Sequence, residues 1–186
     1  MLFLAFYLAF LLLAVALVAG ELLLFGSGIY SSILGAPYVP VNKEIARKMF
    51  SFLPSGRRGL FIDLGSGDGR VLRGAIAAGF KHAVVYELSW WPYLISKLLN
   101  RWHKVGDRAD VVRRSLFDAD ISGADVVYAY LLPKMTDKIL PKLSSELLRG
   151  AKIITCLFRL KDYESGFSLV GQWPIGNKTV YIYEKI

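Results

Sequence analysis

The sequence predicts an α/β fold, in which a mostly parallel sheet ends in an antiparallel hairpin and is preceded by one N-terminal transmembrane helix. Strand-like and helix-like segments alternate from residue 59 onward, which is typical of a parallel sheet with crossover helices. Near the C-terminus, two strand-like segments flank a turn that contains Pro174 and Gly176. Of the first 25 residues, 23 are hydrophobic.

The composition divides the chain into an apolar leader and one domain. Hydrophobic residues make up 54% of the 186 residues, and the mean hydropathy is +0.42. Without residues 1–25 the hydrophobic share is about 48%, which is ordinary for a globular domain. The composition excludes a disordered, collagen-like or polytopic membrane protein, and a single cysteine excludes a disulfide scaffold. We expect an anchor at 1–25, a linker at 26–40 and a domain at 41–186.

We predict that the leader is an uncleaved single-pass membrane anchor. Residues 1–20 carry no charge and, as a helix, would span about 30 Å, the thickness of a hydrocarbon core. A cleaved signal peptide is the main alternative, because Ala14-Val15-Ala16 is a small-residue pattern. Against it, a basic n-region is missing and apolar residues resume at Leu22–Phe25. A buried core helix remains a third reading.

The charge is confined to the part of the chain after the leader. The first basic residue is Lys43, so the domain holds all 23 Lys and Arg residues against 14 of the 15 acidic ones. The positive-inside tendency predicts a cytoplasmic domain. A basic domain suits anionic lipid headgroups, nucleic acid or an acidic partner, unless the charge serves only solubility. Since no basic run has interleaved aromatic residues, we expect no nucleic-acid partner.

The domain is predicted to begin with a helix and two βα units. Asn42 is suited to cap a helix that reaches Leu53. A continuously apolar run at 59–64 predicts a strand buried on both faces. A helix over 70–78 follows, and Gly79 ends it. A strand at 82–88 and a helix from Ser89 to about Lys104 come next.

The second half of the domain continues this alternation and then changes. Strands are predicted at 110–114 and 125–130, followed by a helix over 135–148 that Pro141 interrupts. Gly150 precedes a fifth strand at 151–158. The segments 167–173 and 179–183 predict the closing hairpin.

The stretch from Asp63 to Arg70, DLGSGDGR, carries the strongest functional signal. It joins a strand to a helix through a glycine-rich turn, which brings backbone N–H groups to a ligand at the edge of the sheet. A dinucleotide fingerprint would need glycine at position 70, and the Gly-Lys-Ser/Thr of a Walker A loop is absent. A plain connecting turn would leave Asp63 unexplained, because a carboxylate at the end of a buried strand needs a partner.

A second acid, Glu87, ends the next predicted strand, 22 residues after Gly65. Acids at about this distance accept hydrogen bonds from ribose hydroxyls in nucleotide-binding βαβ units. An exposed strand-end charge is the alternative. Asp63, the turn and Glu87 together predict a pocket for a nucleoside without a pyrophosphate, a description that S-adenosylmethionine fits.

The turn DLGSGDGR, Glu87 and the closing hairpin resemble class I, seven-stranded methyltransferases with a Rossmann-like sheet over residues 41–186. The apolar leader, GAPYVPV at 35–41 and ITCLFRL near the end resemble, more narrowly, the membrane-anchored protein-lysine methyltransferases of the FAM173 type. The resemblance implies S-adenosylmethionine as cofactor and a reactive lysine on a membrane-associated protein as acceptor. Its implied cofactor-binding residues are Asp63, Gly65, Ser66, Gly67, Asp68, Glu87, Ser115 and Leu116.

Individual roles follow from the same resemblance. Gly65 and Gly67 would let the backbone approach the cofactor, Asp63 would meet its amino group and Glu87 would bind the ribose. The family's usual adenine-facing aspartate has no direct counterpart. Either Ser115 replaces it or Asp118 reaches back.

Methyl transfer from a sulfonium needs alignment more than acid–base groups. Aromatic rings can align cations, and Tyr38 and Tyr130 are the candidate substrate-aligning residues, with Trp90 or Trp91 as further candidates. Ordinary packing is the alternative for each. Residues 130–133, YLLP, lack the Asn/Asp-Pro-Pro-aromatic motif of enzymes that methylate nucleobase amino groups. No Cys/His cluster indicates a metal.

These observations predict a membrane-anchored S-adenosylmethionine-dependent methyltransferase that acts on a lysine of a membrane-associated protein. A methyltransferase for a lipid or quinone-like small molecule is the second reading. A non-catalytic membrane protein that binds S-adenosylmethionine is the third.

Overall fold

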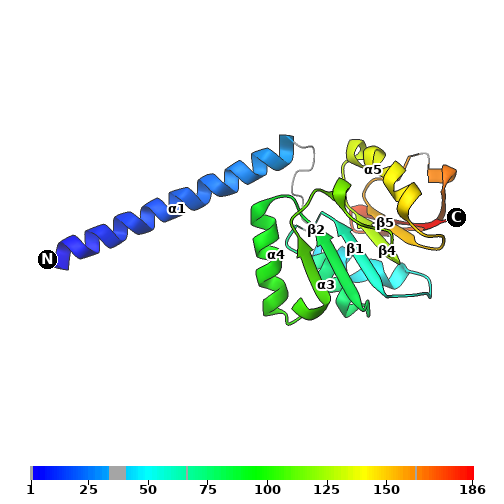
Figure 1. The fold of residues 1–186 in the computed structure, drawn as a ribbon, viewed down its shortest axis with the longest axis horizontal. Helices are drawn as coiled ribbons and strands as arrows, with labels where there is room; N and C mark the ends of the chain where they lie inside the picture. Colours follow the sequence, from blue (N-terminus) through cyan, green and yellow to red (C-terminus); the bar gives the residue numbers. More distant parts are fainter. Residues whose placement is uncertain (1, 34–40, 66, 162) are drawn as a thin grey trace.

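The computed structural model describes residues 2–33, 41–65, 67–161 and 163–186. Its first element, α1 (Leu2–Ile33), is one helix that projects away from the rest of the chain (Figure 1). Within it, Phe3–Leu22 is long and apolar enough to cross a membrane, and none of that stretch is buried. The helix continues through residues 26–33, where the sequence predicts a linker. Extending an existing helix gains one hydrogen bond per residue, which offsets the low helix propensity of Gly26 and Gly28.

Seven strands form one sheet in the described part of the chain, in the order β3-β2-β1-β4-β5-β7-β6. Neighbouring strands from β1 to β5 are parallel, and β7 is antiparallel to both β5 and β6. The predicted α/β fold with a closing antiparallel hairpin is therefore confirmed. The strand bounds are β1 (Leu60–Leu64), β2 (His82–Tyr86), β3 (Ala109–Val112), β4 (Val126–Ala129), β5 (Lys152–Cys156), β6 (Phe167–Ile175) and β7 (Lys178–Lys185).

Helices cover both faces of the sheet (Figure 1). On one face, Phe50, Phe61 and Phe80 pack edge to face with ring centroids 5.4–6.0 Å apart, within the core that α2 and α3 cover. On the other face, α5 contributes Ile139 and Leu143 to a second core. The helix bounds are α2 (Lys43–Lys48), α3 (Arg70–Ala77), α4 (Trp90–Trp102) and α5 (Pro133–Glu146). The 3₁₀ turns are η1 (Met49–Phe52), η2 (Gly106–Arg108), η3 (Leu116–Asp118) and η4 (Tyr163–Ser165).

Two helices differ from their predicted form. The predicted helix over 42–53 is divided into α2 and η1, and Asn42 caps it by accepting a 2.8 Å hydrogen bond from the Glu44 N–H. The predicted interruption at Pro141 is wrong, because α5 runs through this residue. Proline removes one backbone donor, and the buried face around Ile139 and Leu143 keeps the helix in place.

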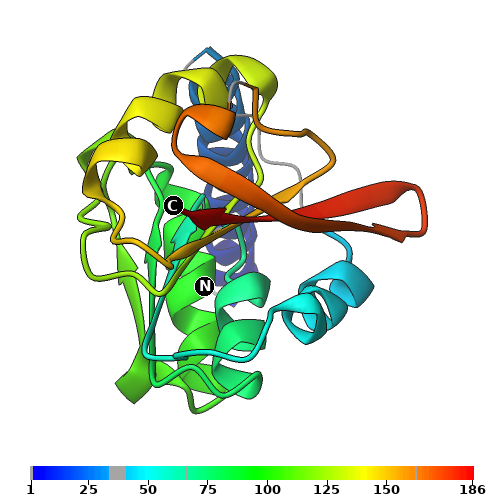
Figure 2. The same ribbon diagram turned by 90° about the vertical axis from the view of Figure 1, so that its right-hand side faces the viewer.

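The hairpin of β6 and β7 projects beyond the edge of the sheet (Figure 2). The ring of Trp173 in β6 stacks on Phe52 of η1, with centroids 5.0 Å apart and planes 3° apart. The segment that precedes β1 in sequence is therefore packed against the last strands of the domain. Because Trp173 is paired with Val180, and Val180 with Cys156, this contact lies at the level of the carboxyl end of β5.

Candidate active site

The predicted site residues converge at the carboxyl edge of the central strands. Asp63 is the penultimate residue of β1, and Glu87 directly follows β2. Asp63 is paired with Tyr128 of β4 across the sheet, so Tyr130 lies at the level of Gly65. Because alternate residues of a strand share a face, Asp63, Tyr128 and Tyr130 are on the same side of the sheet.

Asp63 is a buried carboxyl group, with 1% of the residue exposed. Within the described residues, neither of its oxygens has a hydrogen-bond partner. Burial, together with the charges of Glu87 and Asp68, raises the pKa of Asp63 well above its ordinary value. A buried, unpaired acid is costly, and this one is suited to a ligand that supplies a cationic donor.

The glycine-rich turn has a backbone that only glycine adopts without strain. The φ angles are +128° at Gly65, +52° at Gly67 and +75° at Gly69. A side chain at Gly69 would collide with the hydroxyl of Ser96 in α4, whereas one at Gly65 would meet none of the described atoms within 4 Å. The turn is thus held closely against α4 at one end and is open at the other, where a ligand can approach the backbone.

Glu87 faces this turn from the end of β2. One carboxylate oxygen accepts a 3.3 Å hydrogen bond from the Gly67 N–H, and the other accepts a 2.7 Å bond from the Ser89 N–H. Burial raises the pKa of Glu87, although these backbone donors oppose the effect. A carboxylate accepts hydrogen bonds only, so ribose hydroxyls, which can donate, suit this group.

Asp68 is engaged by Arg70. The Arg70 guanidinium forks onto both oxygens of Asp68, with its Nη2 2.7 Å from Oδ2, and it also donates a 2.7 Å hydrogen bond to the Val41 carbonyl. Arg73 donates to the Asp68 carbonyl at 2.8 Å and to Asn100 Oδ1 at 3.2 Å. These arginines tie the turn to α4 and to residue 41. A direct cofactor contact of Asp68 stays a prediction.

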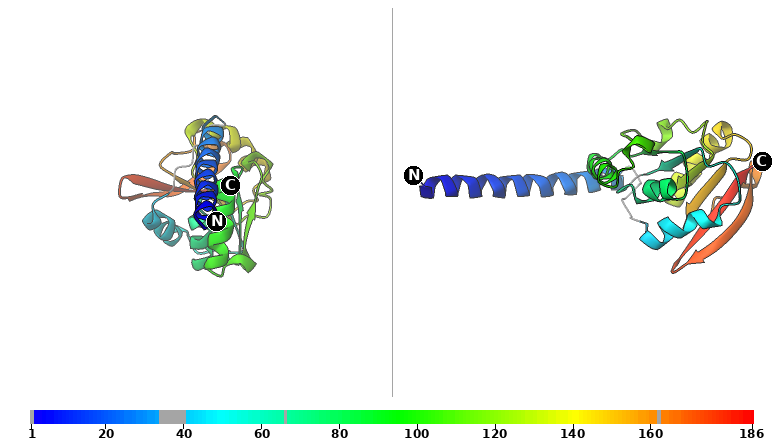
Figure 3. Two further views of the ribbon diagram at one scale, coloured as in Figure 1. Left: turned by 90° about the vertical axis from the view of Figure 1, so that its left-hand side faces the viewer. Right: turned by 90° about the horizontal axis from the view of Figure 1, so that it is seen from below.

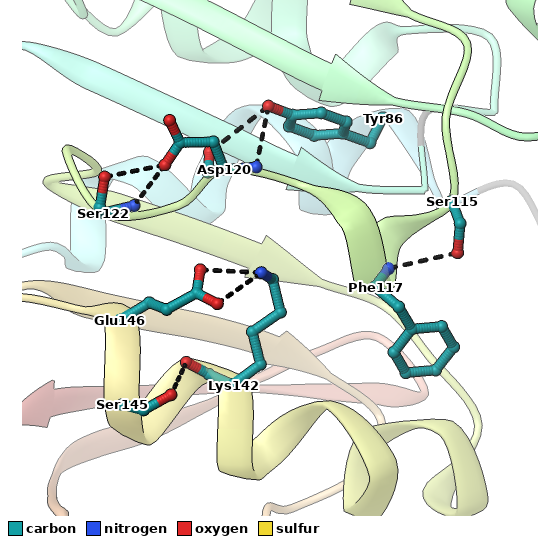
Figure 4. A network of polar contacts seen from close by, with 8 residues as sticks. All are labelled: Tyr86, Ser115, Phe117, Asp120, Ser122, Lys142, Ser145 and Glu146. Carbon is teal, nitrogen blue, oxygen red and sulfur yellow. Dashed lines mark hydrogen bonds and ion pairs between the residues drawn. The ribbon is translucent and has the colours of Figure 1, made fainter.

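The loop after β3 carries the residues predicted to lie near the adenine. Ser115 caps η3 by accepting a 3.3 Å hydrogen bond from the Phe117 N–H (Figure 4). Tyr86 of β2 stabilises the same loop, because its hydroxyl accepts a 3.2 Å bond from the Asp120 N–H. Leu116 is half-buried against the core beside α5, while Asp118 is exposed. The adenine contacts of Ser115 and Leu116 stay predictions.

The aromatic residues predicted to align the substrate lie in different places. Tyr38 and the turn residue Ser66 lie outside the described residues. Tyr130 is paired with Lys178 of β7, whose ammonium donates a 2.8 Å hydrogen bond to the phenol oxygen and lies 4.9 Å from the ring centroid. Trp90 and Trp91 are exposed on the outer side of α4.

Sequence reasoning missed three features of this site, namely the fork from Arg70 to Asp68, the pairing of Lys178 with Tyr130, and Tyr128. The hydroxyl of Tyr128 is fully buried without a partner in the described part of the chain. Burial raises the pKa of this phenol well above its usual value, and the neighbouring acids Cys156 and Asp63 add to the effect. Only the spacing Asp68-x-Arg70 was visible in sequence as a signal.

The residues present fit S-adenosylmethionine. The unpaired Asp63 carboxyl suits its cationic amino group, Glu87 suits its ribose hydroxyls, and the open backbone at Gly65 suits close approach. In the described residues, no cluster of three or more His, Cys, Asp or Glu side chains could hold a metal ion.

Known proteins resemble this chain across the site just described. The family model of the ANTKMT methyltransferase domain matches residues 63–166, beginning at Asp63. The protein-lysine N-methyltransferase of Saccharolobus islandicus is 31% identical over 150 residues, which cover 79% of this chain and 92% of that protein. The adenine nucleotide translocase lysine N-methyltransferase of Mus musculus is 31% identical over 153 residues, which cover 81% of this chain. The chain spans 64%, or just under two thirds, of the length of the mouse protein.

A solved structure connects the fold to the cofactor. The RNA methyltransferase of Salinibacter ruber, in complex with S-adenosyl-L-homocysteine, superposes with a TM-score of 0.73 and 26% identity. The match covers 79% of this chain and 94% of that one. S-adenosylhomocysteine is the product that remains after S-adenosylmethionine has lost its methyl group. The chain is therefore an S-adenosylmethionine-dependent methyltransferase and belongs to the family of the ANTKMT methyltransferase domain.

Proposed function

We propose that this enzyme is a protein-lysine N-methyltransferase that α1 anchors in a membrane, with its domain on the cytoplasmic side. We further propose that its acceptor is a lysine of a membrane-associated protein. The observation that carries the proposal is the combination of the buried Asp63 carboxyl, which has no hydrogen-bond partner among the described residues, with relatives named for lysine methylation, one of which matches over 92% of its length. The apolar, unburied stretch Phe3–Leu22 supports the anchor.

The cofactor supplies an activated methyl group on a sulfonium, and the residues of the chain position it. Asp63 would hold the amino group, and Glu87 would accept hydrogen bonds from the ribose hydroxyls. The backbone at Gly65 and Gly67 would allow the cofactor to approach closely. With the cofactor held at both ends by Asp63 and Glu87, the chain would supply alignment, which is the main contribution that a transfer of this kind requires.

Lys178 would help to deprotonate the acceptor lysine. A lysine acceptor attacks only as the neutral amine, and its ordinary pKa is about 10.4. The ammonium of Lys178, held at 2.8 Å from the Tyr130 hydroxyl, disfavours a second positive charge nearby. An acceptor amine that enters beside Tyr130 would therefore lose its proton more readily than it does in water.

Cofactor binding is expected to strengthen as the pH rises. The pKa of Asp63 is raised well above its ordinary value in the free chain, and a cationic amino group would stabilise its ionised form. Binding then lowers this pKa and releases a proton, so affinity increases by up to about tenfold per pH unit until Asp63 is ionised before binding. Calorimetry in two buffers of different ionisation enthalpy measures the released proton. If the chain binds S-adenosylmethionine but its affinity stays constant or falls as the pH rises, the role of Asp63 is contradicted.

The acceptor class is tested by incubating the full chain with membranes and methyl-labelled S-adenosylmethionine, then separating protein, lipid and RNA. We expect the label in protein. Label confined to lipid would instead support the lipid or quinone methyltransferase, and label in RNA would make the acceptor similar to that of the Salinibacter ruber enzyme. Cofactor binding without transfer to any fraction would support a non-catalytic protein.

A further inference from the structure

Helix α4 has an inverted distribution of polar and apolar side chains. The residues that it buries against the domain are Ser96 and Asn100, which lie beside the glycine-rich turn and Arg73. Its outward face is apolar and exposed, with Leu98 67% and Trp102 80% accessible. The exposed set consists of Trp90, Trp91, Leu94, Leu98 and Trp102.

This set forms one continuous stripe. Residues 90, 94, 98 and 102 follow each other at the i, i+4 spacing that places side chains on one side of a helix, and residue 91 adjoins them. It holds three of the four tryptophans in the chain. Contiguous exposed apolar surface of this kind marks an interaction site, and tryptophan is the residue enriched where a membrane meets water.

Cations border the stripe. Lys97 and Arg101 are exposed on one side of α4, and the guanidinium of Arg113 lies 4.1 Å from the ring centroid of Trp90. On the other side of α4, Leu99 and His103 line a cavity of about 580 Å³. The basic side chains that line this cavity are Lys43, Arg47, Arg70 and Arg73, and Asp68 is the one acid among its described lining residues. Helix α4 itself contains no acidic residue.

The anchor and α4 are close neighbours. The two helices contact each other, and α4 is the helix of the domain on the side toward which α1 projects (Figure 1). Figure 3 shows α4 nearly end-on where α1 meets the domain, so α4 runs across the direction of α1. If α1 crosses a bilayer, α4 lies along the surface of that bilayer rather than pointing into it.

We infer that the outward face of α4 is a membrane-binding surface that inserts its tryptophans and leucines into the headgroup region of an anionic bilayer. An amphipathic helix with aromatic and leucine residues on one face and cations at its border is suited to this position. The inference rests on the proposed anchoring by α1 and goes beyond it, because it fixes which side of the domain faces the lipid. The opposite side of α4, where Ser96 packs against the glycine-rich turn, would then face away from the membrane.

The intrinsic fluorescence of the chain tests this placement. Helix α1 contains no tryptophan, so all tryptophan emission comes from the domain. The full chain is incorporated into phosphatidylcholine vesicles that contain phosphatidylglycerol, with and without bromine on the acyl chains as a contact quencher. The emission of Trp102 is obtained as the difference between the full chain and its Trp102→Phe variant. We expect brominated lipid to remove most of this emission.

A matched pair of variants distinguishes insertion of α4 into the bilayer from nonspecific adsorption of the domain to the vesicles. Leu98→Ser should reduce the quenching of Trp102, whereas Leu148→Ser, at 66% exposure outside α4, should leave it unchanged. Flotation of the chain with the vesicles but unquenched Trp102 emission would overturn the α4 surface and leave the anchor standing. A failure to float would overturn both. Concentration-dependent shielding of Trp102 that bromine does not affect would show a second copy on this face and overturn the membrane assignment.

Discussion

Replacing Asp63 with asparagine is expected to weaken S-adenosylmethionine binding by at least about 30-fold, because a buried charge-assisted contact contributes about 2 kcal/mol or more. The same change should raise the melting temperature of the ligand-free chain near neutral pH. Asparagine has nearly the shape of aspartate but cannot carry the charge that burial and the neighbouring acids Glu87 and Asp68 disfavour. Calorimetry measures the affinity, and thermal unfolding without ligand measures the stability.

The stability gain of Asp63→Asn has a defined pH dependence. The folded-state pKa of Asp63 lies above its unfolded value, so the wild-type group costs nothing at acid pH and destabilises the fold as the pH rises toward its folded pKa. The gain should therefore vanish in acid. Asp137→Asn, on an exposed position of α5, is the matched control and should change neither the cofactor affinity nor the melting temperature. Unchanged cofactor affinity in the Asp63 variant would remove this residue from the site.

Replacing Glu87 with alanine is expected to reduce cofactor affinity by at least about 10- to 100-fold, since even one hydrogen bond to a charged acceptor contributes about 1.5–3 kcal/mol. The change also removes the carboxylate oxygens that accept from the N–H groups of Gly67 and Ser89. Glu87→Gln keeps one acceptor oxygen and should give an intermediate loss. Titration calorimetry of both variants provides the values.

A cofactor analogue distinguishes ribose binding from a general disturbance of the turn. With an S-adenosylmethionine analogue that has hydrogen in place of both ribose hydroxyls, the difference in affinity between wild type and Glu87→Ala should be much smaller than with S-adenosylmethionine. A difference of the same size with both ligands would mean that Glu87 acts only by holding the Gly67 backbone.

The central part of the site was predictable because it depends on local sequence. A buried strand ending in Asp63, a turn of alternating glycines and an acid at the end of the next strand fix a geometry through the pairing of parallel strands. The register between β1 and β2 then brings Glu87 beside Gly67. The closing hairpin was also visible, since Gly176 marks its turn.

The supporting contacts were not predictable because they join residues distant in sequence. Lys178 reaches Tyr130 across 48 residues, and Arg70 reaches the Val41 carbonyl across 29. Such pairs follow from the packing of the hairpin and of the segment before β1, which periodicity does not specify. Helix periodicity likewise groups Leu98 and Trp102 on one side of α4 but cannot tell that this side faces outward.

The identity of the methylated residue tests the central claim most directly. The full chain is incubated with membranes and methyl-labelled S-adenosylmethionine, and the protein fraction is hydrolysed to amino acids. We predict that the label is recovered in methylated lysine. The double variant that carries both Asp63→Asn and Glu87→Ala should transfer no label to the protein fraction. Label recovered in another amino acid, or undiminished in the double variant, would contradict the assignment of a lysine methyltransferase whose cofactor is held by Asp63, the glycine-rich turn and Glu87.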